Sequence, residues 1–314
     1  MVATDAAVDI GAAMNRISVI IPTKNRPADV RALLACLAMQ TRLPHEVLVV
    51  DDSEGREAGP IVASDASQLP FPVCCLRPPG GSLTRARNAG VAKSRGELLV
   101  FLDDDILLQP DFLALLEDTL TACGSDYAGG CGATTPYPDF TPYCHEFNRF
   151  SWLFLHHNFW TGAQLANGMS TFSAVHDRVA DICHVSGGVS IYRREVCEQH
   201  QFDERMNGYS AMEDVDFSTR VGREYRLFYN PRIVVYHRTE PDKGMTTCQY
   251  HYVFMRNYLY LFNKNMRPDV LGWTAMLWSI IGYFLLALRY RQLNRLRGYL
   301  AAIRDTFSQG WAPA

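Results

Sequence analysis

The chain has 314 residues, 48% of them apolar and 20% charged, and its formal net charge is −3. This length suits one large α/β domain with an appendage or two small domains, and the apolar fraction excludes bulk disorder. The slightly acidic balance speaks against a general nucleic-acid binder, which carries a basic surplus, so we expect no nucleic-acid partner.

Two features bear on the cellular compartment. Nine cysteines occur without a C-x-x-C spacing, which favours reduced thiols in a cytosolic compartment over a disulfide framework or a zinc site. Residues 1–15 carry acids and lack the basic-then-apolar pattern of a secretory signal. We expect them to form a flexible leader before the first strand.

Apolar runs and amphipathic patterns alternate through the first half of the chain. We predict strands at 17–21, 46–50, 73–76 and 98–102, and helices at 28–40, 83–93 and 109–123. Strands that alternate with helices of this length predict an α/β fold with a doubly wound, mostly parallel sheet.

The second half is less regular. Residues 137–176 show no clean period, and we expect long loops over a site or a small helical excursion. Further on, we predict strands at 184–192, 227–229 and 233–236 and a helix at 213–224.

A stretch near the C-terminus departs from this soluble pattern. Residues 271–288 carry no charge, and arginines follow at 289, 291, 295 and 297. A membrane-spanning helix needs roughly 20 apolar residues, so the stretch is at the short limit, and basic residues on both sides give no orientation. A single span, a re-entrant hairpin, an interfacial helix and a buried or oligomer-contact helix remain open. Residues 293–307 have the pattern of an interfacial helix.

Three consecutive aspartates, Asp103, Asp104 and Asp105, directly follow the apolar run at 98–102. Ligands collect at the carboxyl ends of strands in open α/β sheets, and three adjacent carboxylates repel one another unless a cation or donors neutralise them. Because side chains alternate along an extended chain, Asp103 and Asp105 point to one side, where they would share a hard cation such as Mg²⁺ or Mn²⁺. We expect the Asp104 side chain to point to the opposite side and to have a structural role. The alternative is a solvated acidic turn that caps the next helix.

Two further groups of residues suit a phosphate-containing ligand. Asp51 ends the second strand, where an acid accepts hydrogen bonds from a base or ribose, although a cap for the following turn is an alternative. Arg85, Arg87 and Asn88 lie on the helix after a glycine pair, and such a helix start favours anions. The alternative is a pair of solvated surface arginines.

An acid pair begins the helix predicted at 213–224. Glu213 and Asp214 are either simple complements of the helix dipole, or Asp214 removes a proton from an acceptor hydroxyl while Glu213 binds the same acceptor. His237 follows a predicted strand, where a neutral imidazole would complete the metal shell. The alternative is a structural histidine.

Taken in order, these segments resemble the family 2 glycosyltransferases, which have the GT-A fold. The likeness covers roughly residues 17–260. The first strand and its loop lie at 19–26, and the end of the second strand at 49–53. The helix at 86–90, with Gly96, precedes the metal motif at 101–105. The glycine pair at 187–188 and the acid pair within 212–214 complete the likeness.

The resemblance implies an inverting transfer from a nucleoside-diphosphate sugar, with UDP or dTDP as the expected nucleotide. It implies that Asp103, Asp105 and His237 hold Mg²⁺ or Mn²⁺, and that Asp214 is the general base. The residues expected on the donor side are Pro22, Thr23, Asn25, Arg26, Asp51, Arg85, Asn88, Asp103 and Asp104. Those expected to bind the acceptor are Gly187, Gly188 and Glu213.

The resemblance also implies a domain plan. Residues 16–245 would be the catalytic domain, with a donor half at 16–135 and an acceptor half at 136–245, and residues 246–314 a helical region. This tail resembles bacterial surface-polysaccharide and rhamnosyltransferase-like members. It implies a lipid-linked or polysaccharide acceptor and membrane contact through 271–307, at the cytoplasmic face of the inner membrane.

Two other functions fit the sequence less well. A catalytically idle, membrane-anchored nucleotide-sugar-binding module is disfavoured because Asp103, Asp105, Glu213 and Asp214 occur together. A sugar-1-phosphate nucleotidyltransferase would need a glycine-rich basic loop after the first strand, and residues 22–26 lack glycine.

Overall fold

The structure is a computed structural model that describes residues 15–55, 58–135, 150–156, 164–169, 177–237, 245–266 and 268–314. The leader expected at 1–15 lies outside the described residues except for Asn15, as do most of the loops expected at 137–176.

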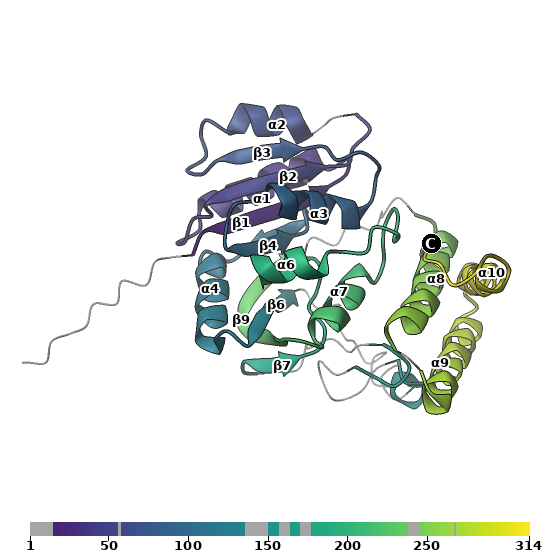
Figure 1. The fold of residues 1–314 in the computed structure, drawn as a ribbon. Helices are drawn as coiled ribbons and strands as arrows, with labels where there is room; N and C mark the ends of the chain where they lie inside the picture. The colour runs from purple at the N-terminus through teal and green to yellow at the C-terminus, as the bar shows by residue number, and fades with distance from the viewer. Residues whose placement is uncertain are drawn as a thin grey trace, which may run out of the picture.

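Four parallel strands form the first half of the sheet, in the order β3-β2-β1-β4. They are β1 (Ile17–Thr23), β2 (Glu46–Asp51), β3 (Val73–Leu76) and β4 (Leu98–Leu102). Between and after them run α1 (Pro27–Ala38), α2 (Ala58–Asp65), α3 (Leu83–Lys93) and α4 (Phe112–Cys123). The parallel, doubly wound arrangement predicted for this half is therefore confirmed (Figure 1).

Alternating side chains of these strands pack on two helical layers. Ile17, Val19 and Ile21 of β1 belong to one buried cluster with α1, α2 and α4. Ile20 belongs to a second cluster on the other face of the sheet with α3. Because both faces are covered, the strands read as continuous apolar runs, which made them visible in the sequence.

The other part of the sheet is built from antiparallel pairs and one parallel pair. Its strands are β5 (Ile106–Leu108), β6 (Tyr127–Thr135), β7 (Ala180–Ile182), β8 (Val189–Arg193) and β9 (Arg226–His237). Beyond β4 the order continues β8-β6-β9-β5, and β7 also pairs with β9. Helices α6 (Arg194–His200) and α7 (Glu213–Val221) cover the same face as α3.

Four predicted elements of the second half differ from the observed ones. The two strands predicted at 227–229 and 233–236 are one strand, β9, which continues through a register shift against β6. The strand predicted at 184–192 begins only at Val189, because the N–H of Gly187 donates to the Asp214 carboxylate at 3.0 Å. The helix predicted at 213–224 ends at Val221, before Gly222.

Strand β6 was not predicted at all, and its glycines explain why. A Cβ atom on Gly129, Gly130 or Gly132 would overlap the backbone of the neighbouring strands. Glycine is required where two strands approach this closely, yet it weakens the strand pattern in the sequence.

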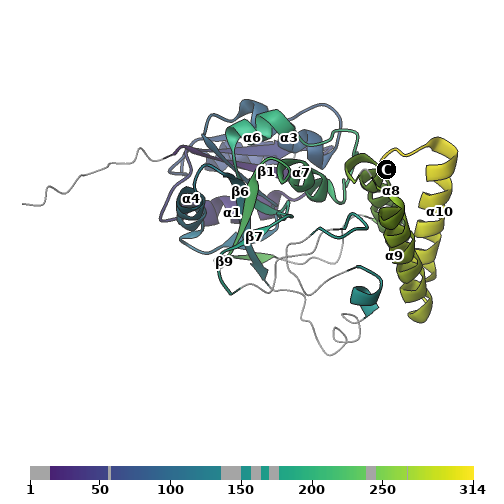
Figure 2. The ribbon, with the colours of Figure 1, turned by 60° about the horizontal axis from the view of Figure 1, so that its bottom comes forward.

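Three helices follow the sheet domain and pack around one apolar cluster. They are α8 (Thr247–Asn265), α9 (Val270–Arg289) and α10 (Leu293–Gln309). Both ribbon views place them together at one side of the sheet domain (Figures 1 and 2). Among the described helices, α9 alone is long and apolar enough to cross a membrane, judged by length and composition.

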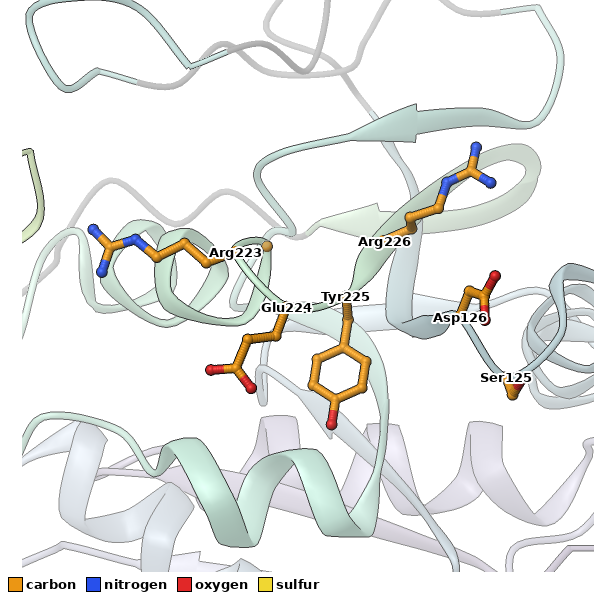
Figure 3. Close-up of a pocket in the computed structure, with 7 residues that line it drawn as sticks. Ser125, Asp126, Arg223, Glu224, Tyr225 and Arg226 are labelled. Carbon is orange, nitrogen blue, oxygen red and sulfur yellow. The ribbon is translucent and has the colours of Figure 1, made fainter.

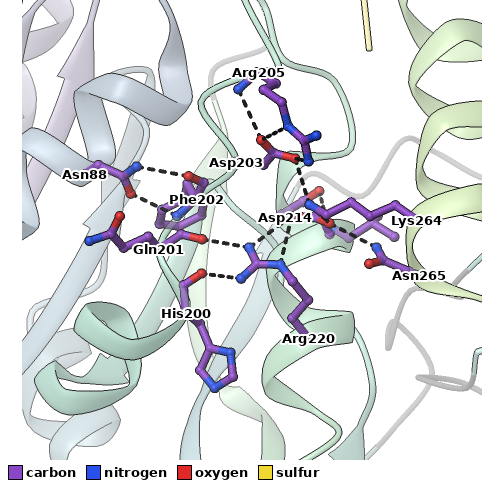
Figure 4. Close-up of polar contacts among 12 residues, drawn as sticks. Asn88, His200, Gln201, Phe202, Asp203, Arg205, Asp214, Arg220, Lys264 and Asn265 are labelled. Carbon is purple, nitrogen blue, oxygen red and sulfur yellow. Dashed lines mark hydrogen bonds and ion pairs between the residues drawn. The ribbon is translucent and has the colours of Figure 1, made fainter. Parts of the chain in front are cut away.

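A polar network joins α8 to the sheet domain (Figure 4). The Lys264 ammonium lies 2.7 Å from a carboxylate oxygen of Asp203 and 2.7 Å from one of Asp216. The Asn265 amide also donates to Asp216, at 2.9 Å. Asp216 lies on α7, so this network connects α8 directly to the helix that begins with Glu213 and Asp214.

Candidate active site

The acids after β4 meet a histidine from the end of β9. Strand β5 pairs Ile106 with His237, which brings the imidazole beside Asp105, and the His237 Nε2 atom lies 3.3 Å from Asp105 Oδ1. One ligand atom each from Asp103, Asp105 and His237 lie within 4.8 Å of one another. Two carboxylates and an imidazole suit Mn²⁺ or Mg²⁺, so the three side chains fit the expected metal.

Asp104 turns away from this cluster, as expected. The Thr23 hydroxyl donates to its carboxylate at 2.6 Å, and an Arg26 nitrogen lies 3.2 Å from the other oxygen. Burial raises the pKa of Asp104 to about 6. Arg26 also lies 2.7 Å from Asp105, so Arg26 and Thr23 attach the loop after β1 to the aspartates.

Arg87 connects the metal-side acids to the acid pair of α7. Its guanidinium is 1% exposed and lies 2.6 Å from the Glu213 carboxylate and 3.6 Å from that of Asp103. It also donates to the Gly187 carbonyl at 2.9 Å. Arg87 is therefore the residue that holds the two halves of the site together.

Arg87 was expected to suit a phosphate-containing ligand or to be a solvated surface arginine, and its link between the two acid groups was not predicted, although the sequence carries a signal for its burial. Thr84, Arg87 and Val91 are buried on α3. Their spacing of three and four residues places them on one helix face. That pattern argues against a solvated surface arginine.

Glu213 and Asp214 have opposite electrostatic environments. Burial, with the neighbouring Asp214 carboxylate, raises the pKa of Glu213 to about 8, against the effect of Arg87. Burial also acts to raise the pKa of Asp214, but His184, whose Nε2 lies 3.3 Å away, and the Gly187 N–H hold it down at about 2. Asp214 is therefore ionised at neutral pH, and its side chain keeps 21% of its surface exposed.

The turn before this pair has an uncommon backbone. Ser210 and Met212 both have positive φ, 49° and 73°. Such conformations cost energy in residues other than glycine and persist where the surroundings impose them. Here Asn257 of α8 donates to the Ala211 carbonyl at 2.9 Å, so α8 helps to hold the turn.

Gly187 and Gly188 pass against the acids with no room for a side chain. A Cβ on Gly187 would lie 2.8 Å from a Glu213 carboxylate oxygen, and one on Gly188 would overlap the Asp103 carboxylate. The backbone of Gly188 also accepts a hydrogen bond from the Asp103 N–H at 2.9 Å. These two glycines therefore shape the floor of the site.

Three more residues expected on the donor side have partners within the chain. The Asp51 side chain is fully buried and accepts from the backbone of Ser53 and Ala58 and from Arg77, which matches the turn-cap alternative. Asn88 binds the Phe202 backbone in both directions (Figure 4). Arg85 lies 3.8 Å from Glu204. These contacts order the structure around the site.

Two other donor-side residues lie in the first loops. Pro22 is buried in β1 beside Val50 of β2. Asn25 has a φ of 58°, and its N–H donates to the Ser53 hydroxyl at 2.7 Å. The loops after β1 and β2 are thereby joined.

A separate surface depression contains none of these residues. It has a volume of about 420 Å³ and lies between α7 and β9 (Figure 3). Its lining is Ser125, Asp126, Gly222, Arg223, Glu224, Tyr225 and Arg226. This lining shares no residue with the cluster of Asp103, Asp105 and His237 or with the acid pair of α7.

Comparison with known proteins gives a consistent result. Residues 18–201 match the family described as Glycosyl transferase family 2. An uncharacterized glycosyltransferase of Haemophilus influenzae is 38% identical over 96 residues, which are 30% of this chain and 31% of that protein. The succinoglycan biosynthesis protein ExoM of Rhizobium meliloti is 29% identical over 111 residues, 35% of this chain and 36% of that protein. The matched segments thus span about a third of each curated relative.

A solved structure extends the likeness over the whole fold. The mannosyltransferase PcManGT of Pyrobaculum calidifontis, in complex with GDP-Man and Mn²⁺, superposes with a TM-score of 0.59 at 17% identity, covering 94% of this chain and 87% of that one. At this identity the likeness concerns the fold, and it confirms the expected GT-A architecture.

Proposed function

Because the chain belongs to glycosyl transferase family 2, we propose that it transfers a sugar from a nucleoside-diphosphate sugar to an acceptor hydroxyl, with inversion at the anomeric carbon. The observation that carries the proposal is the contact of Arg87 with both Asp103 and Glu213. It sets a cluster suited to a divalent cation beside an ionised carboxylate, Asp214. A metal-assisted leaving group and a general base are what a single displacement requires.

On the donor side, Asp103, Asp105 and His237 would hold Mg²⁺ or Mn²⁺. The bound cation would neutralise the charge that develops on the departing diphosphate. The joined loops at 22–26 and 51–53 lie at the same carboxyl edge of the sheet, where the nucleotide would lie. UDP and dTDP are the nucleotides expected for this chain, and GDP belongs in the same screen.

On the acceptor side, Asp214 accepts the proton of the attacking hydroxyl. The hydroxyl oxygen forms a bond to the anomeric carbon as the bond from that carbon to the diphosphate oxygen breaks, and the electron pair leaves with the diphosphate. His184 and the Gly187 N–H orient the Asp214 carboxylate. Glu213, held by Arg87, is placed to bind the same acceptor.

The acceptor and the location belong to the same proposal. A lipid-linked or polysaccharide acceptor at the cytoplasmic face of the inner membrane agrees with the apolar helix α9. The name of the similar succinoglycan biosynthesis protein points to the same class of product.

A donor screen tests the proposal. Thermal unfolding is followed with UDP-, dTDP- and GDP-sugars, each with and without Mn²⁺, and sugar release or transfer is measured for every donor that binds. A bound donor raises the midpoint of unfolding by mass action, and we expect one nucleotide class to do so only with Mn²⁺ and to turn over. Metal-dependent binding without turnover would favour the idle module. Release of pyrophosphate from a nucleoside triphosphate and a sugar 1-phosphate would favour a nucleotidyltransferase.

A further inference from the structure

Helix α9 exposes an apolar face along its whole length. Leu271, Leu277, Trp278, Ile281, Leu285 and Leu288 are each more than 40% exposed. Their spacing returns to one side of the helix every three or four residues, and residues 271–288 include no charged side chain. An exposed apolar surface of this extent marks a binding face.

The face continues beyond α9. The Trp278 indole donates to the Leu153 carbonyl at 2.7 Å, and its ring stacks on Phe154. Next to this contact, Trp152 and Leu153 are 55% and 53% exposed. Trp152 and Trp278 thus lie on the same surface, and tryptophan is enriched where protein meets the boundary between lipid and water.

The remaining sides of α9 contact protein. A Cβ on Gly282 would overlap the Phe154 side chain, and His156 lies 2.8 Å from the Ser279 carbonyl. Met276 and Ala287 are buried in the apolar cluster shared with α8 and α10. Among the residues that the structure describes, one side of α9 is therefore left without a protein contact.

The helices behind α9 carry polar pairs that do not suit hydrocarbon. Arg256 of α8 donates to the Thr306 hydroxyl of α10 at 2.8 Å, and Tyr252 donates to Asp305 at 3.1 Å. A spanning α9 would bring α8 and α10 to the bilayer with it, because the three helices pack in one apolar cluster, and ionised groups in hydrocarbon are costly. This argues against the single-span alternative.

We propose that the outward face of α9, together with Trp152 and Leu153, binds one leaflet of an anionic lipid bilayer, with the helix axis in the membrane plane. The exposed residues of α10 support this occupant, because Arg297 lies there among Leu293, Leu300 and Phe307, whereas Arg304 is paired with Asp305 at 2.8 Å. Arg289 and Arg291 add positive charge at the end of α9. Arginines beside an apolar helix face complement anionic headgroups.

This orientation places the acceptor side of the site next to the membrane-bound helices. Asn257 of α8 holds the turn that precedes Glu213, and Lys264 of α8 binds Asp203 and Asp216. A lipid-linked acceptor would therefore arrive from the bilayer at the end of the site where Asp214 lies. This last step rests on the proposed function, whereas binding to the bilayer does not.

Vesicle sedimentation of the full chain, without nucleotide sugar, tests the proposal. We expect the protein to bind vesicles of phosphatidylcholine with phosphatidylglycerol, more weakly when salt is added. The combined variant Leu277→Gln, Ile281→Gln and Leu285→Gln should lower vesicle binding at least about tenfold. Three apolar side chains that would transfer from water into the bilayer are then replaced by polar ones. Arg291→Gln with Arg297→Gln should lower binding only to the anionic vesicles, by about fivefold per arginine at low salt.

A matched control uses Met39→Gln with Val179→Gln, which replaces exposed apolar side chains outside α9. This variant should bind vesicles like the unaltered chain. Lipids brominated near the headgroup should quench Trp278 fluorescence more than lipids brominated at the end of the acyl chain, with Trp278→Phe as the reference. Retention on membranes after alkaline carbonate extraction, with stronger quenching from deep bromines, would show a spanning helix and overturn the proposal. Absence of vesicle binding, or a dimer that the triple variant converts to a monomer, would also overturn it.

Discussion

The buried guanidinium of Arg87 lies 2.6 Å from the carboxylate of Glu213, across 126 residues of sequence. This contact joins α3 to the first turn of α7. Asp103 lies 3.6 Å from Arg87, and Asp214 is the chain neighbour of Glu213. The geometry of the proposed transfer would therefore depend on two residues, neither of which is the proposed base or an expected metal ligand.

Removing Arg87 should destabilise the fold strongly. Above about pH 8, where Glu213 is ionised, Arg87→Met leaves the buried Glu213 carboxylate without its partner, and breaking a buried pair from one side costs about 3–5 kcal/mol. The double variant Arg87→Met with Glu213→Gln should recover part of that loss, because no unpaired charge remains. Urea unfolding of the two single variants and the double variant measures the coupling. Simple addition of the two single effects would contradict the role of the pair.

Much of the donor half was predictable, and the reason is visible in β4 and α3. Both elements have the bounds that the sequence predicts, since β4 is a continuous apolar run and α3 follows a glycine pair. The proximity of His237 to Asp105 was proposed from order along the chain alone. Its physical basis is the antiparallel pairing of β5 with β9, and β5 has only three residues, too few to give a pattern.

What the sequence did not indicate arises from contacts between distant segments. Asp51 follows a strand like a ligand-binding acid, yet the N–H groups of Ser53 and Ala58 and the side chain of Arg77 occupy its carboxylate. Asn88 is bound by the backbone of Phe202, which lies 114 residues away. Such partners are brought together by tertiary packing, and no local sequence pattern indicates them.

Glu213 should make the protein less stable as the pH rises. Its pKa is about 8 in the folded chain, above the ordinary value of 4.5. The folded state thus holds the proton more tightly, so this contribution to stability is complete below about pH 4.5 and is lost as the pH rises through about 8. Glu213→Gln keeps an oxygen facing Arg87 and should flatten the dependence of the unfolding midpoint on pH across that window. An unchanged slope in the variant would assign the dependence to another group.

His184 should set the pKa of the base. Replacing it in His184→Phe removes the partner that holds the pKa of Asp214 at about 2. Burial would then raise the pKa, and the acid limb of the kcat/KM profile should move to higher pH. His200→Phe serves as the control, since His200 lies near Glu224 rather than near the site. A loss of activity with an unmoved acid limb would mean that His184 acts only through folding.

Gly188→Ala should weaken metal binding while leaving most of the fold intact. The new Cβ would overlap the Asp103 carboxylate and displace one of the three expected ligands. Calorimetric titration with Mn²⁺ should show a loss of affinity of at least about tenfold, as expected when ligand geometry is disturbed. Gly59→Ala is the control, because nothing lies within 4 Å of a Cβ there. Equal Mn²⁺ affinity in both variants would show that Asp103 is not a ligand of the metal.

Asp105→Asn should also weaken Mn²⁺ binding, because it removes one negative charge from the expected ligands Asp103, Asp105 and His237. The loss of Mn²⁺ affinity should be at least as large as that of Gly188→Ala. In the unaltered chain, chelation of divalent metal should abolish both donor binding and transfer. Asp126→Asn, in the separate depression of Figure 3, should change neither property. Full donor affinity after chelation would exclude a role for the metal in holding the donor.

The most direct test of sugar transfer at this site is the turnover of Asp214→Asn, measured together with its donor affinity. Asparagine preserves the shape and accepts a hydrogen bond from Gly187, but it does not take the proton of the acceptor hydroxyl. The account predicts transfer reduced by about 10²-fold or more, with donor affinity and Mn²⁺ affinity unchanged. Turnover equal to that of the unaltered chain would contradict the assignment of Asp214 as the general base.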